Sequence, residues 1–421
     1  MKKSNANKVI PVIMSVAMCP MMLPTAAFAA DDGAVSGGGS SFTTELTQSS
    51  AQAEGADAGA ISGATSVAQP EATGKAADAT TGKASDQEAA NEAAAPAAET
   101  SGEGTTAAVA EVNGTKYSSL QAAIDAAAKN STVKLLADTY ENVTISTYGI
   151  VFDLNGHTLN GGTVKGKPAL TINNTRVTVQ DSSEAQTGTI MREDTAENSG
   201  VSSHYVIDVQ GGSAFLKFDS GTVRNNSGAG GTKGASLVRI GDDSVKVQPS
   251  MTINGGTFTQ DNFIALKCDY GTLYVNGGEV NSKYSYAIEN WRNATVQNSA
   301  VINGNVSSWT YSGGISSKLT IAGGTVNGNV ESVTYDGDGG KTAKVVITGG
   351  TVNGTLNTID YSTGTTSSDP TKATIEVTGG TFSSNPSRYL VESSSATQNE
   401  DGTYGVEKAY LAQVGETSYY T

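Results

Sequence analysis

A short apolar strand that ends in Gly-Gly recurs along the second half of the sequence, and this repeat limits the possible folds more than any other feature. The copies lie at 252–258, 274–280, 319–326, 345–352 and 375–382, with a degenerate copy at 296–302. The second small residue of each copy stands at 256, 278, 300, 324, 350 and 380, so the spacing is 22, 22, 24, 26 and 30 residues. A nearly fixed period of this length is typical of solenoids, in which each repeat packs on its neighbours.

Other positions keep the same spacing. Ala265-Leu266-Lys267, for example, recurs 22 residues later as Ala287-Ile288-Glu289. Each repeat holds two or three strands that are too short to be stable alone, but they can pair in parallel with their counterparts in the next repeat. An antiparallel sandwich with Asn-Gly hairpins would not preserve this spacing at unrelated positions. The sequence therefore predicts an all-β fold, a parallel β-helix of about nine coils between Tyr140 and Phe382.

The Gly-Gly pairs and the residue before them have distinct expected roles. The chain contains 50 glycines in 421 residues, well above the usual ~7 %. We expect the pairs to let the backbone turn where a β-carbon would clash. Asn254, Asn276 and Asn298 precede successive pairs, and their amides are expected to stack as a ladder from coil to coil.

A solenoid has open strand edges at both ends, and the sequence supplies segments to cover them. Residues 118–129 are predicted to form an N-terminal cap helix, with Ser118 and Gln121 as a capping box. Its apolar residues Leu120, Ile124 and Ala127 fall on one face of such a helix. Residues 383–408 depart from the repeat and are predicted to form the C-terminal cap, so the domain spans 109–408.

The N-terminus has the pattern of a secretory signal peptide. Lys2, Lys3 and Lys8 precede a mostly apolar stretch, and Ala27-Phe28-Ala29 fits an A-x-A cleavage site. We therefore predict a signal peptide at 1–29, cleaved between Ala29 and Ala30. The apolar stretch is short and contains two prolines, so no stable membrane span is expected. Only Cys268 would remain in the mature chain, which excludes an intrachain disulfide and favours the bacterial cell surface or secretion.

Residues 30–108 are predicted to form a disordered, low-complexity tether. The segment has one aromatic residue, Phe42, and twelve acidic residues against two lysines. A chain with so little to bury and so much negative charge stays extended. The whole chain carries 26 basic and 41 acidic residues, a formal charge of −15, so a nucleic-acid partner is not expected.

Several short segments give the chain a family resemblance. They are VNGT at 112–115, AAID at 122–125, VKLL at 133–136, FDLNGHTL at 152–159, and the closing GGTF at 379–382 and DGTY at 401–404. Together they resemble right-handed parallel β-helix, pectin-lyase-like modules of large Gram-positive cell-surface and adhesin-like proteins. The resemblance implies the architecture and a surface location. It implies no single activity, because such modules include lyases, hydrolases, adhesins and stalks.

The last residues repeat the first residues of the domain. Ala110–Tyr117 reads AEVNGTKY, and 412–419 reads AQVGETSY. We therefore expect 409–421 to be the start of a truncated second module, in a longer chain with tandem modules.

Catalytic residues of the pectin-degrading type are incomplete in this sequence. Asp242 and Asp243, with Asp208 from the preceding coil, are the candidate acid pair of a hydrolase. Lys267, Asp269 and Arg292, with Glu289 nearby, are the candidate basic and acidic groups of a lyase. The simpler interpretation is that Lys267 and Glu289, one coil apart, form a surface ion pair. Neither histidine, His157 or His204, stands in the expected motif. Asp336-Gly337-Asp338-Gly339-Gly340 is a partial calcium loop that lacks its closing Glu, so neither a metal nor a cofactor is predicted.

Aromatic residues gather in the C-terminal coils and are the candidate glycan contacts. They are Tyr284, Trp291, Trp309, Tyr311, Tyr335 and Tyr361. Trp309, Val333 and Ile359 align at steps of 24 and 26 residues, and three tyrosines align beside them. Two interpretations remain: inward packing with rings stacked along the solenoid, or an exposed strip that stacks on sugar rings.

These observations together predict a secreted, surface-displayed β-helix module with a structural or adhesive role. Its expected partner is a carbohydrate or another ligand on host or microbial surfaces. The alternative is a polysaccharide lyase or glycoside hydrolase of the same fold. The sequence contains no complete catalytic motif, so whether the chain is an enzyme stays open.

Overall fold

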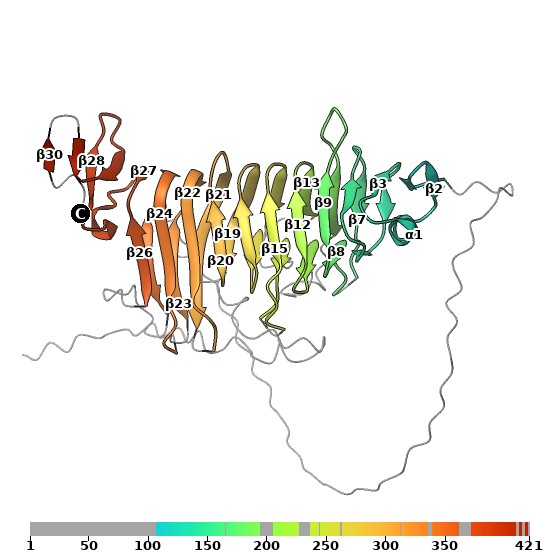
Figure 1. The fold of residues 1–421 in the computed structure, drawn as a ribbon, viewed down its shortest axis with the longest axis horizontal. Coiled ribbons are helices and arrows are strands. Elements are labelled where there is room, and N and C mark those ends of the chain that lie inside the picture. The colour runs from blue at the N-terminus through green and yellow to red at the C-terminus, as the bar shows by residue number, and fades with distance from the viewer. Residues whose placement is uncertain are drawn as a thin grey trace, which may run out of the picture. The chain divides into compact units, whose positions relative to one another are not determined.

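Regular structure in this chain is almost entirely β. The computed structural model describes residues 107–409, except 165, 194–204, 227–235, 244, 262, 312, 336–338 and 362–371, and the backbone of two strands at 412–414 and 417–419. The elements in this part of the chain are strands apart from one α-helix and a 3-10 turn (Figure 1), so the expected all-β class is confirmed. The predicted signal peptide, its cleavage site at Ala29 and Ala30, and nearly all of the predicted tether lie outside the described residues.

Parallel strand pairs connect each part of the chain to a part roughly one repeat later, in three series that we call ladders A, B and C. Ladder A joins β4 (Thr139–Tyr140), β7 (Thr158–Asn160), β10 (Thr189–Glu193), β13 (Thr222–Asn226), β16 (Thr257–Gln260), β19 (Glu279–Asn290), β21 (Val301–Tyr311), β22 (Ser317–Asn327), β24 (Ala343–Val352) and β27 (Gly380–Phe382).

Ladder B joins β3 (Thr132–Leu135), β6 (Ile150–Asp153), β9 (Arg176–Gln180), β12 (Phe215–Phe218), β15 (Ser250–Ile253), β18 (Thr272–Val275), β20 (Asn293–Val296), β22, β24 and β26 (Ala373–Val377). Ladder C joins β5 (Val143–Ile145), β8 (Leu170–Asn173), β11 (Ile207–Gln210), β14 (Val238–Ile240), β17 (Leu266–Cys268), β19, β21, β23 (Val330–Tyr335) and β25 (Leu356–Asp360). The repeats therefore pair in parallel, which excludes the antiparallel sandwich.

The main core lies between the ladders and is built from equivalent residues of successive strands. In ladder C, for example, Ile207, Val238, Leu266 and Ile288 are in register and fully buried. Because side chains of a strand alternate between its two faces, the residues between them point away from this core. Each buried aliphatic side chain contributes about 1.5–3 kcal/mol of transfer free energy, and the stacking repeats this gain at every step.

The Gly-Gly pairs are required by close contacts between neighbouring repeats. A β-carbon on Gly277 would lie 2.5 Å from the carbonyl oxygen of Asn254. Gly278 has φ of 77°, in the left-handed region that favours glycine. In β22 and β24 the pair lies inside one long strand, at the register shift between the residues that pair in ladder B and those that pair in ladder A.

Amide ladders run along the outside, but one expected member is wrong. Asn276 Nδ2 donates to Asn254 Oδ1 at 2.9 Å, as predicted. The next donor is Gln297, whose Nε2 lies 2.8 Å from Asn276 Oδ1, whereas Asn298 occupies a left-handed position with φ of 55°. A second ladder, not foreseen, joins Asn281, Asn303, Asn327 and Asn353 through bonds of 2.7, 2.7 and 2.8 Å.

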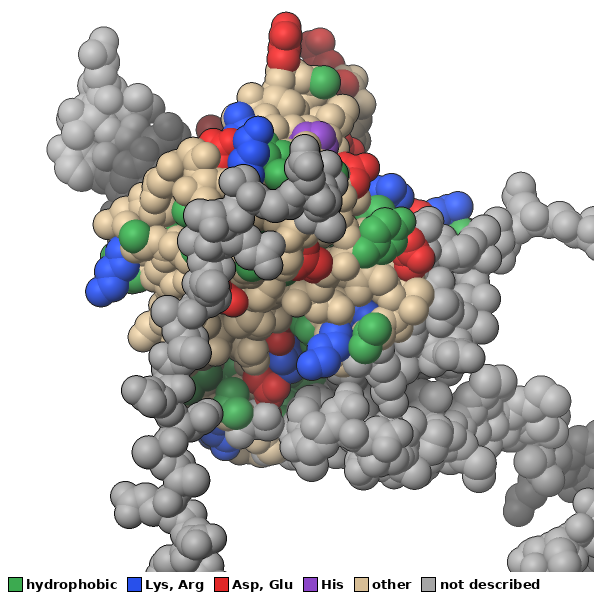
Figure 2. Space-filling view, turned by 90° about the vertical axis from the view of Figure 1, so that its right-hand side faces the viewer, with side chains coloured by type: hydrophobic (Ala, Val, Ile, Leu, Met, Phe, Trp, Pro, Cys, Tyr) green, Lys and Arg blue, Asp and Glu red, His purple; other side chains and the backbone are tan. Residues whose placement is uncertain are grey.

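The N-terminal end carries helix α1 (Leu120–Ala126), shorter than the predicted 118–129. Ser119 is its N-cap, so the expected role of Ser118 is wrong by one residue. The carboxylate of Glu141 accepts from the amides of Leu120 and Gln121 at 2.7 and 3.0 Å, which satisfies two of the unpaired donors of the first turn. Figure 2 shows this end of the molecule, where hydrophobic and charged side chains are scattered among other side chains and backbone.

Antiparallel strands flank the parallel ladders. β1 (Ala110–Val112) pairs with both β2 (Thr115–Tyr117) and β3. After β27 come a 3-10 turn, η5 (Ser387–Tyr389), and the strands β28 (Ser394–Gln398) and β29 (Tyr404–Lys408), and β29 pairs antiparallel with β27. β30 (Ala412–Val414) and β31 (Thr417–Tyr419) form a separate hairpin. No helix among the described residues has the length and apolar character needed to cross a membrane.

Candidate functional site

Nearly all candidate residues lie on or beside the outward side of ladder C. Equivalent outward positions of β11, β14, β17, β19, β21 and β23 carry Asp208, Arg239, Lys267, Glu289, Ser307 and Glu331. We call these six residues, all charged except Ser307, the charged column. Although they point away from the main core, Lys267, Glu289 and Glu331 are only 2 %, 0 % and 4 % exposed. Charges at such depth require partners.

Arg239 binds two carboxylates at one end of the charged column. Its Nη2 lies 2.8 Å from Asp208, and its Nη1 lies 2.7 Å from Asp242. The guanidinium also stacks 4.8 Å from the ring of buried Tyr205. Burial works against the charge of Arg239, but Tyr205 and the two carboxylates outweigh it and raise its pKa. Asp242 and Asp208 thus bind the same guanidinium, and Arg239 was not among the predicted site residues.

Asp243 does not join Asp242 in a pair. Its carboxylate accepts a 2.7 Å hydrogen bond from the hydroxyl of Tyr311, 68 residues later. A hydrolytic acid pair needs two carboxyl groups that face one bond. The structure instead places one carboxylate on an arginine and the other on a tyrosine.

Lys267 forms a buried ion pair with Asp269, with 2.9 Å between Nζ and Oδ1. Burial opposes the lysine charge, but Asp269, Tyr205 and Glu289 together raise the pKa of Lys267 above its ordinary value. A catalytic base needs a pKa near the working pH, so Lys267 is held as an ammonium ion. A surface ion pair of Lys267 with Glu289 is not what the structure shows. The two residues are in register, but both are buried.

Arg292 lies over the ring of Tyr270, with 5.5 Å from Cζ to the ring centroid. Its Nε is buried and has no hydrogen-bond partner. Of the proposed lyase residues, Lys267 and Asp269 are therefore paired with each other, whereas Arg292 packs against an aromatic ring.

A second hydrophobic cluster covers part of the outer side of ladder C. We call it the aromatic layer; its buried members are Phe263, Ile264, Tyr286, Trp291, Trp309 and Val333, and Tyr311, Tyr335, Ile359 and Tyr361 pack against them. The predicted alignment is confirmed, since Trp309 is in register with Val333, and Tyr311 with Tyr335. Of the two interpretations, inward packing is correct in that the rings are packed together, but they form a cluster that is distinct from the main core.

Trp309 is the centre of the aromatic layer and is fully buried. Its ring lies 5.3 Å from Trp291 and 5.7 Å from Tyr361, with the Tyr361 ring nearly parallel at 20°. Tyr286 meets it edge-on at 5.9 Å. These separations are those of favourable aromatic pairs, so the layer is a packed unit.

Carboxylates of the charged column accept hydrogen bonds from the aromatic layer. Trp291 Nε1 donates to Glu289 at 2.7 Å, and the Tyr286 hydroxyl donates to Glu331 at 2.6 Å. Burial raises the pKa of Glu331, although the hydrogen bonds from Tyr286 and Asn357 oppose it. Glu331 was not among the predicted site residues, because no local sequence pattern pairs it with Tyr286.

The six predicted glycan contacts differ in exposure. Trp309 is 0 % and Trp291 5 % exposed, so their faces are occupied by protein. Tyr311, Tyr335 and Tyr361 are half-buried and lie at the margin of the aromatic layer. Tyr284 is also half-buried but lies outside the layer, with the ammonium of Lys283 4.8 Å from its ring. The three marginal tyrosines are therefore the group that the structure brings together.

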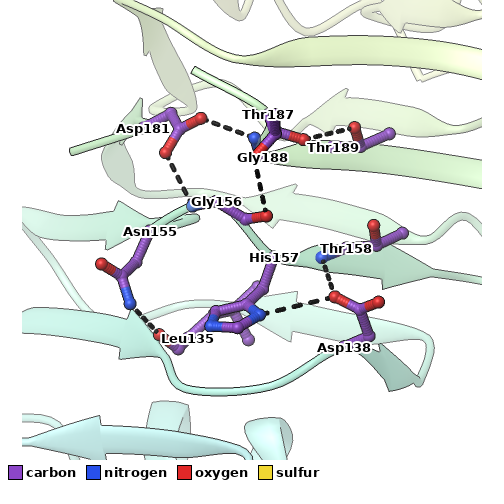
Figure 3. Close-up of polar contacts among 10 residues, drawn as sticks. All are labelled: Leu135, Asp138, Asn155, Gly156, His157, Thr158, Asp181, Thr187, Gly188 and Thr189. Carbon is purple, nitrogen blue, oxygen red and sulfur yellow. Dashed lines mark hydrogen bonds and ion pairs between the residues drawn. The ribbon is translucent and has the colours of Figure 1, made fainter. Parts of the chain in front are cut away.

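His157 belongs to a separate polar cluster near the N-terminal end (Figure 3). Its Nδ1 lies 3.5 Å from Asp138, which also accepts from the amide of Thr158. Asp181 accepts from the amides of Gly156 and Gly188. Burial opposes ionisation of Asp181, but these and other hydrogen bonds lower its pKa. The cluster joins successive turns through backbone groups, and His204 lies outside the described residues.

Groups of three or more His, Cys, Asp or Glu side chains that could hold a metal ion do not occur within the described part of the chain. The partial calcium loop begins at 336, and residues 336–338 lie outside that part. Comparison of the chain with protein-family models, curated proteins and solved structures finds no match.

Proposed function

We propose that the domain is a right-handed parallel β-helix of about nine coils, of the kind found in pectin-lyase-like modules. The three parallel ladders support this proposal, because strands of ladders B, A and C follow one another along the chain in a repeating order. In this arrangement α1 covers the first coil, with Leu120, Ala123 and Ile124 buried beneath it. Strands β28 and β29 do the same at the last coil.

We propose further that this β-helix is an exported bacterial surface module that binds glycans. The observation that carries the proposal is the set of half-buried tyrosines at the margin of the aromatic layer, Tyr311, Tyr335 and Tyr361. Tyr311 and Tyr335 end the paired strands β21 and β23, and Tyr361 directly follows the next strand, β25. Neighbouring strands are spaced by ~4.8 Å. Trp309 packs behind two of them and fixes their orientation. Preformed aromatic faces with a polar hydroxyl suit sugar rings, since sugars also have one apolar face.

Adhesion is favoured over catalysis by the state of the charged groups. Asp242 is ion-paired with Arg239, and Lys267 with Asp269. These pairs are largely buried, so the groups that would act on a substrate are engaged with each other. The signal peptide and tether proposed for 1–108 would export the domain and extend it from the cell.

A binding experiment tests this function. Residues 107–421 are applied to an array of mucin-type, hyaluronan and pectin glycans, and Tyr311→Ala and Tyr361→Ala are compared with the unaltered protein. We expect each substitution to weaken binding at least about tenfold, a loss of ~1.4 kcal/mol. Tyr274→Ala is the matched control, because Tyr274 is 41 % exposed on β18, away from the aromatic layer.

Equal binding by all variants would overturn the proposal. The enzyme alternative is assayed on the same glycans by release of reducing or unsaturated ends. Release that is lost in Lys267→Ala or Asp242→Asn would replace adhesion with catalysis as the function.

A further inference from the structure

Two hairpins at opposite ends of the domain have the same pairing. In the first, Ala110 pairs with Tyr117 and Val112 with Thr115. In the second, Ala412 pairs with Tyr419 and Val414 with Thr417. The register is identical, and these four positions carry the same residue types in both hairpins. The β30–β31 hairpin is therefore equivalent to the β1–β2 hairpin in both register and sequence.

The two hairpins differ in what their first strand contacts. β1 is paired on both edges, with β2 on one side and with β3 on the other. Ala110 is 0 % and Val112 4 % exposed, because both are part of the main core. Among the described residues, β30 pairs only with β31. An isolated two-stranded hairpin is at best marginally stable in water.

We propose that the second edge of β30 is a docking edge for a further β-helix module, and that β30–β31 begins the N-terminal cap of that module. The occupant is a strand equivalent to β3, which would pair antiparallel with β30 as β3 pairs with β1. This proposal is independent of the ligand that the aromatic layer binds.

The next residues in the sequence agree with this role. Tyr117 is followed by two residues, the second of which is Ser119, the N-cap of α1. Tyr419 is also followed by two residues, the second of which is Thr421. Threonine is a good N-cap residue because its hydroxyl accepts from the amides of the first turn. Each hairpin is thus followed, at the same spacing, by a residue type that is suited to an N-cap.

A second copy of this strand from another molecule does not fit the edge. In every copy of the chain, β3 is already paired with β1 and with β6. Its edges are therefore occupied, and pairing in trans would require one of these contacts to open. A module that follows on the same chain needs no such opening.

The test builds the missing module from the chain's own sequence. Residues 120–408 are joined directly after Thr421, so that the new helix starts where α1 starts after Ser119. Amide hydrogen exchange of 412–414 is then measured in the extended protein and in the 421-residue chain. We expect exchange to slow at least about tenfold in the extended protein, because strand pairing and burial protect amides.

Two substitutions at β30 make the test specific. Ala412→Asp puts a charge at the position equivalent to fully buried Ala110, and we expect it to abolish the added protection at 412–414. Gln413→Glu restores the residue type of half-buried Glu111, and we expect it to leave the protection unchanged. In the 421-residue chain, both substitutions are expected to leave the exchange of 107–408 unaltered.

Equal exchange at 412–414 in the 421-residue chain and the extended protein would overturn the proposal. Protection that survives Ala412→Asp would also overturn it, because the edge would then be covered in another way. Protection in the 421-residue chain that rises with protein concentration would identify a second copy of the chain as the occupant.

Discussion

The hydroxyl of Tyr286 donates a 2.6 Å hydrogen bond to the carboxylate of Glu331, which lies 45 residues later. The two residues are 0 % and 4 % exposed. Tyr286 is on β19 and Glu331 on β23, and β21 lies between these strands in ladder C. The bond therefore spans two steps of the ladder and joins the aromatic layer to the charged column.

Glu331 is expected to make stability fall as pH rises above the ordinary range of glutamate. Burial raises the pKa of Glu331 in the folded state. Between the unfolded pKa, ~4.3, and the raised folded value, the native state binds more protons than the unfolded state. The free energy of unfolding then decreases with rising pH. Glu331→Gln removes this titration, so urea unfolding should depend less on pH between 4 and 7 in the variant.

Tyr286→Phe tests the other partner of the same bond. Without the phenol, the buried carboxylate loses a donor, and we expect a loss of about 1–3 kcal/mol at pH 7. The loss should shrink as pH falls, since a protonated Glu331 needs the donor less. A loss that is equal at pH 4 and pH 7 would contradict this explanation.

Glu141 is predicted to stabilise the folded protein with the opposite pH dependence, so that its contribution is lost as the pH falls. Burial opposes its ionisation, but hydrogen bonds from the amides of Gln121 and Leu120 lower the pKa of Glu141. Stability from this group is therefore present above the unfolded pKa and lost as pH falls through the lowered folded value. We expect Glu141→Gln to cost about 1 kcal/mol at pH 7. Hydrogen exchange of the α1 amides at pH 7 and at pH 3 measures this loss of stability. Glu184→Gln, at an exposed residue, is the control.

Gly277→Ala is predicted to be among the most damaging single-methyl changes in the domain. The added β-carbon would lie 2.5 Å from the backbone oxygen of Asn254, and no side chain can move to relieve the contact. We expect a loss of more than about 3 kcal/mol in chemical unfolding. Gly212→Ala is the matched control, because its β-carbon would meet nothing closer than 3.7 Å. That change should be neutral or slightly stabilising, as the unfolded chain loses freedom.

The sequence predicted the parts of this structure that repeat. The step from Lys267 to Glu289 is a constant spacing, and both residues take equivalent positions in ladder C. Repeats identify such pairs because parallel pairing converts a period into a register. They do not say which positions are covered, so Lys267 was expected at the surface and is buried.

The contacts of the candidate site were harder to predict, because they join residues that are not related by the repeat. Arg239 lies between Asp208 and Asp242, and Tyr311 reaches Asp243 across 68 residues. Only side-chain direction and the shape of the aromatic layer determine these pairs. The aromatic alignment itself was visible, but whether the layer faced the main core could not be read from spacing, since inward and outward positions share the same period.

Cys268 is predicted to be unreactive in the folded protein. Burial raises the pKa of its thiol to about 12, so the thiolate, which is the reactive form, is scarce at pH 8. We expect iodoacetamide to label Cys268 only as fast as the domain unfolds, with complete labelling in urea. Peptide mapping distinguishes Cys268 from Cys19, and rapid labelling of the native protein at Cys268 would refute the prediction.

Trp309 and Trp291 provide a spectroscopic test of the aromatic layer. Their rings lie 5.3 Å apart at 30° and both are buried, so their indole transitions should couple and give a paired positive and negative band in the circular dichroism spectrum. The sequence contains only two tryptophans, so Trp309→Phe or Trp291→Phe alone should remove the whole paired band. Trp309→Phe should also destabilise the domain by about 1–3 kcal/mol, because it leaves a cavity and takes the donor away from Ser307. If each single variant instead keeps half of the signal, the two indoles are not in contact and the aromatic layer is not packed as described.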